Sequence, residues 1–335
     1  MKVIAIDSRQ QWVELELPTP EPGPGDLLVR IEAVAVNPID TKLRGSVAAG
    51  AAPKVLGWDA AGVVLAVGEA VTGFQPGDEV FYAGDVLRPG CNAELQLVDA
   101  RLAAHKPATL GFAEAAALPL TGLTAWESLF ERLGICAEGT DQDRCLLIIG
   151  AAGGVGSMAI QLAKQVAGLN VIATASRPES LAWCRDLGAD VCLDHAGDWI
   201  ADMRAGGLRY VDYVLNCNSV DAYWDAMAEA VKPQGIVCCL ASAIQPLDLN
   251  RFKNKSVRIA WEFMFTKAMY QTDDMASQGE ILKQLADLVD IGITRSTLTD
   301  CLGPLSPANL SLAHARIEQG HTIGKLALTG MGATA

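Results

Sequence analysis

The run CLLIIGAAGGVGSMAIQLAKQVAG, at residues 145–168, constrains the fold more than any other stretch of this chain. Its first residues, Cys145–Ile149, are a short apolar run typical of a strand buried on both faces. Gly150, Gly153, Gly154 and a further glycine at position 156 follow, and beyond them apolar residues recur at helical spacing. The run therefore predicts a strand, a glycine turn and a helix. The N–H groups at the start of that helix would face a pyrophosphate, with the backbone of Gly150 to Val155 around it.

The same stretch has to be tested as a membrane span. Residues 145–163 carry no charge between Arg144 and Lys164, which is long enough to cross a bilayer. Several glycines within a few positions would weaken a membrane helix, but they suit a turn in which backbone closely approaches a ligand. We therefore expect a dinucleotide-binding turn and no membrane association.

The segments that follow supply the context that a glycine motif needs. Strand and helix patterns alternate along them: strand Asn170–Ala175, helix 178–187, strand Val191–Asp194, strand Val211–Asn216, helix 221–231 and strand 236–241. Such alternation predicts an α/β fold with a doubly wound, mostly parallel sheet, the Rossmann arrangement.

The residues at the end of the second strand indicate whether the domain binds NAD or NADP(H). An acidic residue there would bond the ribose hydroxyls of NAD, but this chain has Ser176 and Arg177, and no acid before Glu179. Ser176 can donate to a 2′-phosphate and Arg177 can neutralise it, so NADP(H) is favoured. Arg177 could instead be a surface charge at a helix start. His195, after the third strand, is either a flank of the adenine or its phosphate or an ordinary loop residue.

Composition excludes several classes of protein. With 50% hydrophobic and only 19% charged residues, the chain would not stay open and disordered. Its net charge of −13 opposes binding to nucleic acid, whose affinity comes largely from Lys and Arg. The nine cysteines are odd in number and show no C-x-x-C spacing, so we expect reduced thiols. The N-terminus MKVIAIDSRQQW lacks the pattern of a signal peptide, so we expect a cytoplasmic protein.

The first part of the chain has a different character, because short strands are punctuated there by Gly/Pro turns, which is typical of a β-rich domain. The motifs of the whole chain together resemble medium-chain dehydrogenases/reductases of the quinone-oxidoreductase type. They are NPIDTKLRG at 37–45, LGWDAAGVV at 56–64, VGEAVTGFQPGDEV at 67–80, LPLTGLTAWESL at 118–129, GAAGGVGSMAIQLAK at 150–164, TASRPESL at 174–181, LGAD at 187–190 and GKLAL at 324–328.

This resemblance implies a GroES-like catalytic domain made of residues 1–122 and 267–335. A Rossmann NADP(H)-binding domain, residues 123–266, would be inserted into it, with the active site in the cleft. It also implies a homodimer. The segment 261–265 (WEFMF) is either a core strand, the better reading, or part of the substrate cleft or the dimer contact.

Zinc-dependent members of the superfamily bind a catalytic metal through a Cys and a G-H-E triplet. In this chain the resemblance places Asn37 at the Cys position, and the triplet reads Gly57-Trp58-Asp59. The third ligand position falls at Leu120-Thr121. Zinc needs three or four nitrogen, sulfur or oxygen ligands around it, so we expect a zinc-independent site, although such chains often carry the label "zinc-type alcohol dehydrogenase-like".

Without a metal, hydrogen-bond donors must stabilise the charge that develops on the acceptor oxygen. The candidate catalytic donors are Asn37, Lys42 and Tyr82. The resemblance supports Asn37 and Tyr82, whereas Lys42 departs from the family pattern, which usually has a tyrosine at that position. Asn37 could otherwise be a turn residue, Lys42 a solvated charge and Tyr82 a packing residue. Further predicted cofactor contacts are Thr121 at the nicotinamide or its ribose, the backbone of Leu240 and Ala241 at the carboxamide, and Lys325 at the phosphates, unless Lys325 is a surface lysine.

A quinone or an α,β-unsaturated carbonyl spreads the developing charge, so modest donors suffice for its reduction. We therefore expect an NADPH-dependent, zinc-free quinone or enone reductase with a small-molecule electron acceptor. Two alternatives stay open: a reductase of simple aldehydes or ketones, and a low-turnover NADPH-binding protein with a structural or regulatory role.

Overall fold

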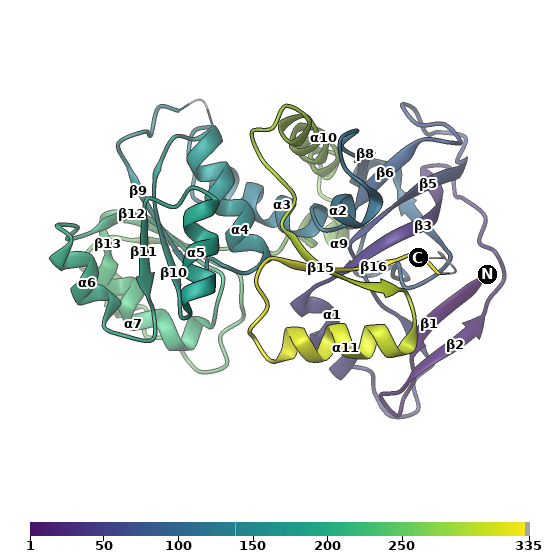
Figure 1. The fold of residues 1–335 in the computed structure, drawn as a ribbon, viewed down its shortest axis with the longest axis horizontal. Helices are drawn as coiled ribbons and strands as arrows, with labels where there is room; N and C mark the ends of the chain where they lie inside the picture. The colour runs from purple at the N-terminus through teal and green to yellow at the C-terminus, as the bar shows by residue number, and fades with distance from the viewer. Residues whose placement is uncertain (138, 332–335) are drawn as a thin grey trace. The chain divides into compact units, whose positions relative to one another are not determined.

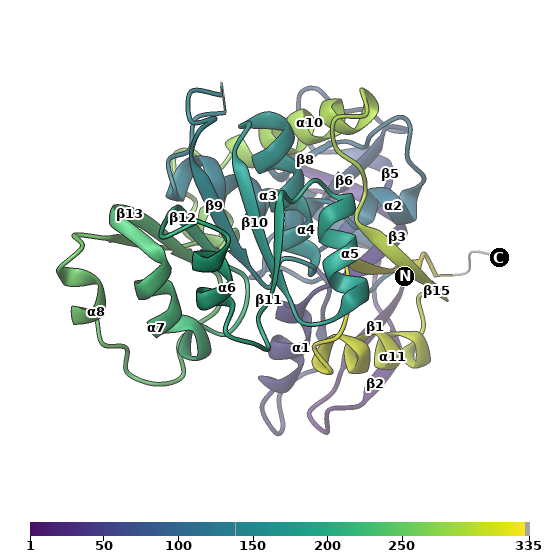
Figure 2. The ribbon, with the colours of Figure 1, turned by 60° about the vertical axis from the view of Figure 1, so that its left-hand side comes forward.

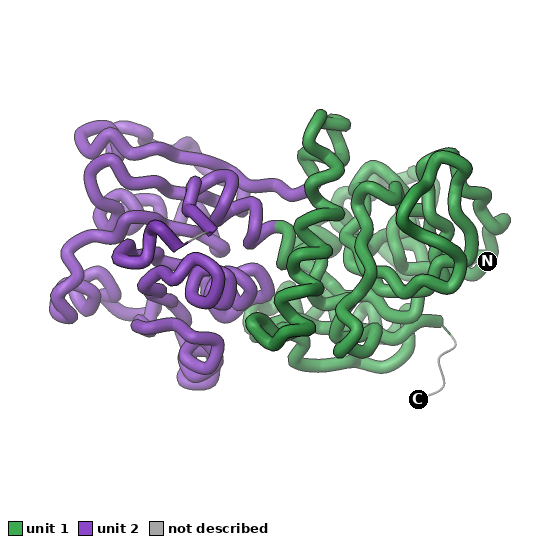
Figure 3. The backbone as a smooth tube through the Cα atoms, turned by 90° about the horizontal axis from the view of Figure 1, so that it is seen from above, with its two compact units in different colours: residues 1–123, 265–335 green, residues 124–264 purple. Residues whose placement is uncertain are grey.

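The structure, a computed structural model, describes residues 1–137 and 139–331. The chain divides into two compact units (Figure 3): unit 1 is Met1–Leu123 with Phe265–Ala335, and unit 2 is Thr124–Met264. The second unit is therefore inserted into the first in sequence. The predicted boundaries, after residues 122 and 266, lie within two residues of these divisions.

Unit 2 contains a parallel sheet with the strand order β11-β10-β9-β12-β13-β14. Its strands are β9 (Cys145–Ile149), β10 (Asn170–Ala175), β11 (Val191–Asp194), β12 (Val211–Asn216), β13 (Val231–Cys239) and β14 (Arg258–Trp261). The order reverses between β9 and β12, which is the switch point where doubly wound folds bind ligands. The Rossmann prediction is confirmed, and β9 to β12 have the predicted bounds.

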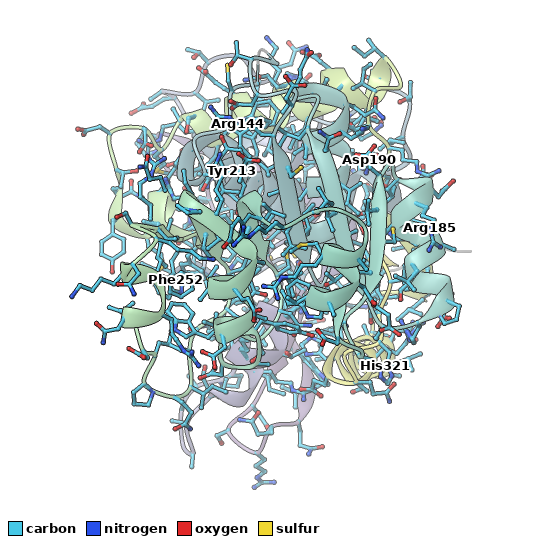
Figure 4. The ribbon with its side chains drawn as sticks, turned by 90° about the vertical axis from the view of Figure 1, so that its left-hand side faces the viewer. Arg144, Arg185, Asp190, Tyr213, Phe252 and His321 are labelled. Carbon is cyan, nitrogen blue, oxygen red and sulfur yellow. The ribbon has the colours of Figure 1, made fainter. Side chains whose placement is uncertain are left out.

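Helices cover both faces of this sheet (Figures 1 and 2). The helical segments are η2 (Glu127–Arg132), α4 (Gly154–Gln161), η3 (Leu162–Val166), α5 (Pro178–Asp186), α6 (Trp199–Ala205), α7 (Val220–Ala230) and α8 (Asn250–Lys253). Apolar residues of α6, α7 and α8 pack against alternate residues of the central strands, among them Leu147 and Ile149. Phe252, labelled in Figure 4, comes from α8. Its ring packs edge-on against Trp224, with ring centroids 4.8 Å apart.

Unit 1 is built mainly on antiparallel strands, with one parallel pair, β15 and β16. One sheet has the order β15-β16-β3-β5-β6-β8, with β7 also paired to β3, and a second has the order β2-β1-β4. The strands are β1 (Lys2–Ile6), β2 (Trp12–Glu16), β3 (Asp26–Val36), β4 (Lys54–Val55), β5 (Ala60–Val67), β6 (Glu79–Tyr82), β7 (Leu95–Asp99), β8 (Ala103–His105), β15 (Leu298–Pro304) and β16 (Lys325–Thr329). The C-terminal β16 pairs with β3, so the two parts of unit 1 share one sheet.

The helices of unit 1 are α1 (Pro38–Gly45), η1 (Ala100–Leu102), α2 (Phe112–Ala116), α9 (Thr266–Tyr270), α10 (Ser277–Asp290) and α11 (Pro307–Glu318), and α3 (Pro119–Trp126) runs from this unit into unit 2. The core lies between the sheet and residues of α9 and α11, and it includes Val29, Val34 and Leu310. None of the described helices is both long and apolar enough to cross a membrane.

Two predicted elements differ from the structure. Strand β13 begins at Val231, directly after α7, and not at residue 236. The segment 261–265 is not a core strand: β14 ends at Trp261, whose side chain is 46% exposed, and the residues after it have left the strand. The apolar residues of this segment suggested a buried strand. However, β14 lies at the edge of its sheet, so part of its surface has no neighbouring strand to cover it.

Candidate functional site

The glycine turn of unit 2 has the geometry that the sequence predicts. Gly150 has a φ of 74°, in the left-handed region, and its N–H donates to Thr174 Oγ1 at 3.3 Å. A Cβ at Gly156 would lie 2.5 Å from the carbonyl oxygen of Ala151, so only glycine lets α4 start this close to the turn. A Cβ at Gly153 would meet nothing closer than 3.7 Å. The first N–H groups of α4, from Gly154 onward, have no carbonyl of their own helix to bond, so the turn fits a pyrophosphate.

Three further predicted residues follow β10 and β11, the two strands on one side of β9. Ser176 is exposed directly after β10, and Arg177 stands at the start of α5 with its Nε 3.2 Å from Glu179 Oε1. His195 follows β11, and its Nδ1 lies 3.0 Å from Thr174 Oγ1. Burial lowers the pKa of His195, so the ring is neutral at neutral pH.

Leu240 and Ala241 follow β13, and the Leu240 N–H donates to Asn216 O at 3.2 Å. The carboxyl ends of parallel strands meet at one edge of a sheet, so the glycine turn, Ser176, His195 and Leu240 lie along the same edge of unit 2. This edge is where open α/β sheets bind their ligands.

Unit 1 holds a buried polar cluster made of Asn37, Asp59 and Lys325. Lys325 Nζ lies 2.8 Å from Asp59 Oδ2 and 2.5 Å from Asn37 Oδ1, and it also donates to Val36 O at 3.2 Å. Asn37 Nδ2 donates to Asp59 Oδ2 at 3.1 Å. The exposed fractions are 1% for Asn37, 0% for Asp59 and 3% for Lys325, so these charges interact without screening by water.

Strand register brings this cluster together. Leu326 pairs with Val36, which places Lys325 at the start of β16 beside the end of β3. The Ala35 N–H donates to Asp59 O at 2.9 Å, and Asp59 directly precedes β5. Pro38 opens α1 and keeps Asn37 extended, because the residue before a proline avoids the helical region.

Asp40 lies beside the cluster and caps the start of α1. Its Oδ2 accepts a hydrogen bond from the Asn37 N–H at 2.6 Å, while its buried Oδ1 has no partner among the described residues. Burial raises the pKa of Asp40 to about 7, although the bond from Asn37 and the charge of Lys325 oppose the shift. Burial also raises the pKa of Asp59, against the opposing effect of the Lys325 ammonium. When Asp40 is protonated, the remaining charges are the Asp59 carboxylate and the Lys325 ammonium, so the cluster and Asp40 together carry no net charge.

The other predicted unit 1 residues lie in different surroundings. Lys42 is exposed on α1. Tyr82 is 1% exposed and its hydroxyl donates to Gln96 Oε1 at 2.9 Å, which matches the packing alternative. The Thr121 hydroxyl lies 3.3 Å from the carbonyl oxygens of Ala117 and Leu118, which directly precede α3.

Lys325 differs most from expectation. It is neither a surface lysine nor free for a phosphate, because its three donor hydrogens match its three acceptors within unit 1. The sequence carried a signal for this, since Lys325 opens the apolar run KLALT, which reads as a buried strand. The partnership with Asp59 depends on long-range strand pairing, and no local pattern reveals it.

The residues at the zinc positions of the superfamily do not fit zinc. Trp58 is buried and its indole N–H donates to Asp85 O at 3.0 Å. The Leu120 N–H donates to Asp59 Oδ1 at 3.0 Å, and Asp59 Oδ2 holds the ammonium. One carboxylate already paired with a cation and one amide cannot supply the three or four ligands that zinc takes. In the part of the chain that the structure describes, no group of three His, Cys, Asp or Glu residues is placed to hold a metal.

Two family descriptions match the chain. "Alcohol dehydrogenase GroES-like domain" matches residues 23–125, and "Zinc-binding dehydrogenase" matches residues 154–278. The second match lies mostly in unit 2 and includes neither Asn37 nor the 57–59 triplet, so its name does not bear on the metal positions.

Curated relatives cover nearly the whole chain. A zinc-type alcohol dehydrogenase-like protein of Staphylococcus aureus is 41% identical over 316 residues, which are 94% of this chain and 93% of that protein. The chloroplastic NADPH-dependent alkenal/one oxidoreductase of Arabidopsis thaliana is 31% identical over 323 residues, 94% of this chain and 74% of that protein.

Solved structures match over the same extent. A Rhizobium etli protein provisionally described as a zinc-dependent alcohol dehydrogenase has a TM-score of 0.94 at 45% identity, with 99% of each chain covered. The quinone oxidoreductase of Escherichia coli, in complex with NADPH, has a TM-score of 0.82 at 25% identity, covering 98% of this chain and all (100%) of that chain.

Proposed function

We propose, since this chain belongs to the medium-chain dehydrogenase/reductase superfamily, that it is an NADPH-dependent reductase of quinones or α,β-unsaturated carbonyls that works without zinc. Membership makes the chain an oxidoreductase with a dinucleotide-binding Rossmann unit. The observation that carries the finer proposal is the buried Asn37–Asp59–Lys325 cluster. The resemblance places Asn37 and Asp59 at metal-ligand positions of zinc-dependent relatives, and in this chain the Lys325 ammonium contacts both side chains.

Unit 2 supports the choice of NADP(H). The exposed Ser176 and the Arg177 guanidinium follow β10, at the position where an NAD-specific fold carries an acid. Two similar proteins are described with NADPH: the Arabidopsis oxidoreductase and the E. coli quinone oxidoreductase. When bound, NADPH would supply the hydride.

Unit 1 would supply the hydrogen bond to the acceptor. Asn37 Nδ2 has two hydrogens, and one of them bonds Asp59. The second would donate to the oxygen on which negative charge develops, as in other sites that use preorganised donors. A single amide is a modest donor, so it suits an acceptor that delocalises the charge. A saturated aldehyde or ketone would need a stronger electrophile and a proton relay.

The test is an initial-rate assay with a panel of acceptors. NADPH and NADH oxidation would be followed with benzoquinones, 2-alkenals, enones and saturated aldehydes. We expect turnover with the conjugated acceptors, at least tenfold higher kcat/KM with NADPH than with NADH, and little turnover with saturated aldehydes. A preference for saturated carbonyls would favour the simple reductase, and tight NADPH binding without turnover would favour a binding role.

The proposed assembly is a homodimer. Strand β14 lies at the end of the unit 2 strand order, and Trp261, where it ends, is 46% exposed. An unpaired strand edge with an exposed aromatic side chain can pair with a second copy of the same strand. Sedimentation velocity would test this, with the dimer expected for the wild type and a monomer for a Trp261→Glu variant.

A further inference from the structure

We infer that Lys325, together with Asp59, is a positioning residue that fixes the orientation of the Asn37 carboxamide and leaves a single Nδ2 hydrogen to donate to the acceptor oxygen. The inference rests on the proposed function and deepens it, because it assigns a role to a charged pair that lies beneath the proposed donor. It also changes the expected role of Lys325 from a phosphate contact to a support of the donor.

The two charges permit only one orientation of the amide. The Lys325 ammonium can only donate, and it lies 2.5 Å from Asn37 Oδ1. The Asp59 carboxylate can only accept, and it lies 3.1 Å from Asn37 Nδ2. Rotating the amide by 180° would turn its N–H groups toward the ammonium and its oxygen toward the carboxylate. Both contacts would then be repulsive.

The partners of the amide are themselves held in place. Lys325 also donates to Val36 O, and Asp59 Oδ1 accepts from the Leu120 N–H at 3.0 Å. Within the described residues, the second hydrogen of Asn37 Nδ2 has no recorded partner. This is therefore the one hydrogen of the amide that the network leaves available.

The ammonium also strengthens the remaining donor. A positive charge bound to an amide oxygen draws electron density from the nitrogen, and linked hydrogen bonds reinforce one another where water is absent. Lys325 and Asp59 are 3% and 0% exposed, so this polarisation is not screened. An amide alone is a modest donor, and the buried ammonium behind it makes it more effective.

The deciding experiment removes both charges together. In a Lys325→Met/Asp59→Asn variant no carboxylate is left unpaired. The new amide can still accept from the Leu120 N–H, and its nitrogen would take the place of Asp59 Oδ2. That nitrogen faces Asn37, so it favours the inverted Asn37 amide, which turns the free hydrogens toward the methionine.

We expect the double variant to unfold cooperatively with a midpoint near that of the wild type and to bind NADPH within about threefold of wild type. Its kcat should fall on the order of 100-fold, the effect of losing one preorganised donor, while KM changes little. Adding Asn37→Ala to this background should cost no further activity, although Asn37→Ala alone should cost about as much as the double change.

The matched control is Lys106→Met. Lys106 is also largely buried in unit 1 and donates to carbonyl oxygens and an acidic side chain, here Pro107, Leu110 and Glu79. Its loss should leave kcat within about twofold. Undiminished kcat in the folded double variant would overturn the positioning role and leave the proposed function standing. A wild-type protein that reduces none of the conjugated acceptors would overturn the proposed function and this inference with it.

Discussion

The candidate site of unit 2 is formed by backbone, whereas the candidate site of unit 1 is formed by side chains. In unit 2 the turn between β9 and α4 is made of backbone, and its shape follows from Gly150 and Gly156, which stand close together in sequence. In unit 1 the cluster is made of side chains from the ends of β3, β5 and β16, and Asn37 and Lys325 are 288 positions apart in the sequence. A local motif specifies the first site, whereas strand pairing across the whole chain specifies the second. Substitutions in the two sites should therefore have different effects on stability and binding.

The largest expected effect comes from leaving a buried charge of unit 1 without its partner. Lys325→Met leaves the Asp59 carboxylate buried without its cation, and breaking a buried pair in this way typically costs about 3–5 kcal/mol. Urea unfolding would measure the loss in free energy of unfolding. Most of the lost free energy of unfolding should be restored in the Lys325→Met/Asp59→Asn variant. A single variant as stable as the wild type would contradict the ion pair.

The next effect is a dependence of stability on pH that arises in unit 1. Burial raises the pKa of Asp40 from 3.8 to about 7, so the folded state keeps a proton that the unfolded state has lost. The contribution of Asp40 is therefore most favourable below pH 4 and declines as the pH rises to about 7, by on the order of a few kcal/mol. Asp40→Asn should flatten this part of the stability curve in urea titrations at pH 4 to 8. An unchanged slope would show that Asp40 is already ionised in the folded protein.

A steric change tests the backbone site of unit 2. At Gly156→Ala the new Cβ would lie 2.5 Å from Ala151 O, a backbone atom that cannot move alone. We expect a loss of about 1–3 kcal/mol, as for other overpacked positions, and weaker NADPH binding. Gly153→Ala is the control, because its Cβ has 3.7 Å of clearance, and it should keep the stability of the wild type. Equal losses in both variants would argue against close packing of turn and helix.

The smallest effect concerns nucleotide choice. Arg177→Ala should weaken NADPH binding about tenfold, roughly the free energy of one hydrogen bond to a charged group, and leave NADH binding nearly unchanged. Fluorescence titration with the two nucleotides measures both constants. Equal weakening for both nucleotides would show that Arg177 does not recognise the 2′-phosphate.

The contrast between the units also explains what the sequence could predict. Strands β9, β10, β11 and β12 have the predicted bounds because each is a short apolar run closed by glycine or polar residues. The glycine turn could be predicted from the glycine spacing together with the strand before it and the strand–helix alternation after it. The position of Lys325 could not be predicted in this way, because its burial depends on the pairing of β16 with β3 and on Asp59 across the sheet. The prediction of a core strand at residues 261–265 was wrong for a similar reason, because a run of apolar residues does not show which strand lies at the edge of a sheet.

In the proposed mechanism, an amide backed by a buried ion pair does the work that a metal does in zinc-dependent relatives. The most direct measurement is the rate of NADPH oxidation with a quinone or enone acceptor by protein that has been treated with a chelator and shown by elemental analysis to be free of zinc. We predict a kcat equal to that of the untreated protein, with no gain on adding zinc. Loss of activity on chelation and its return with zinc would contradict the account.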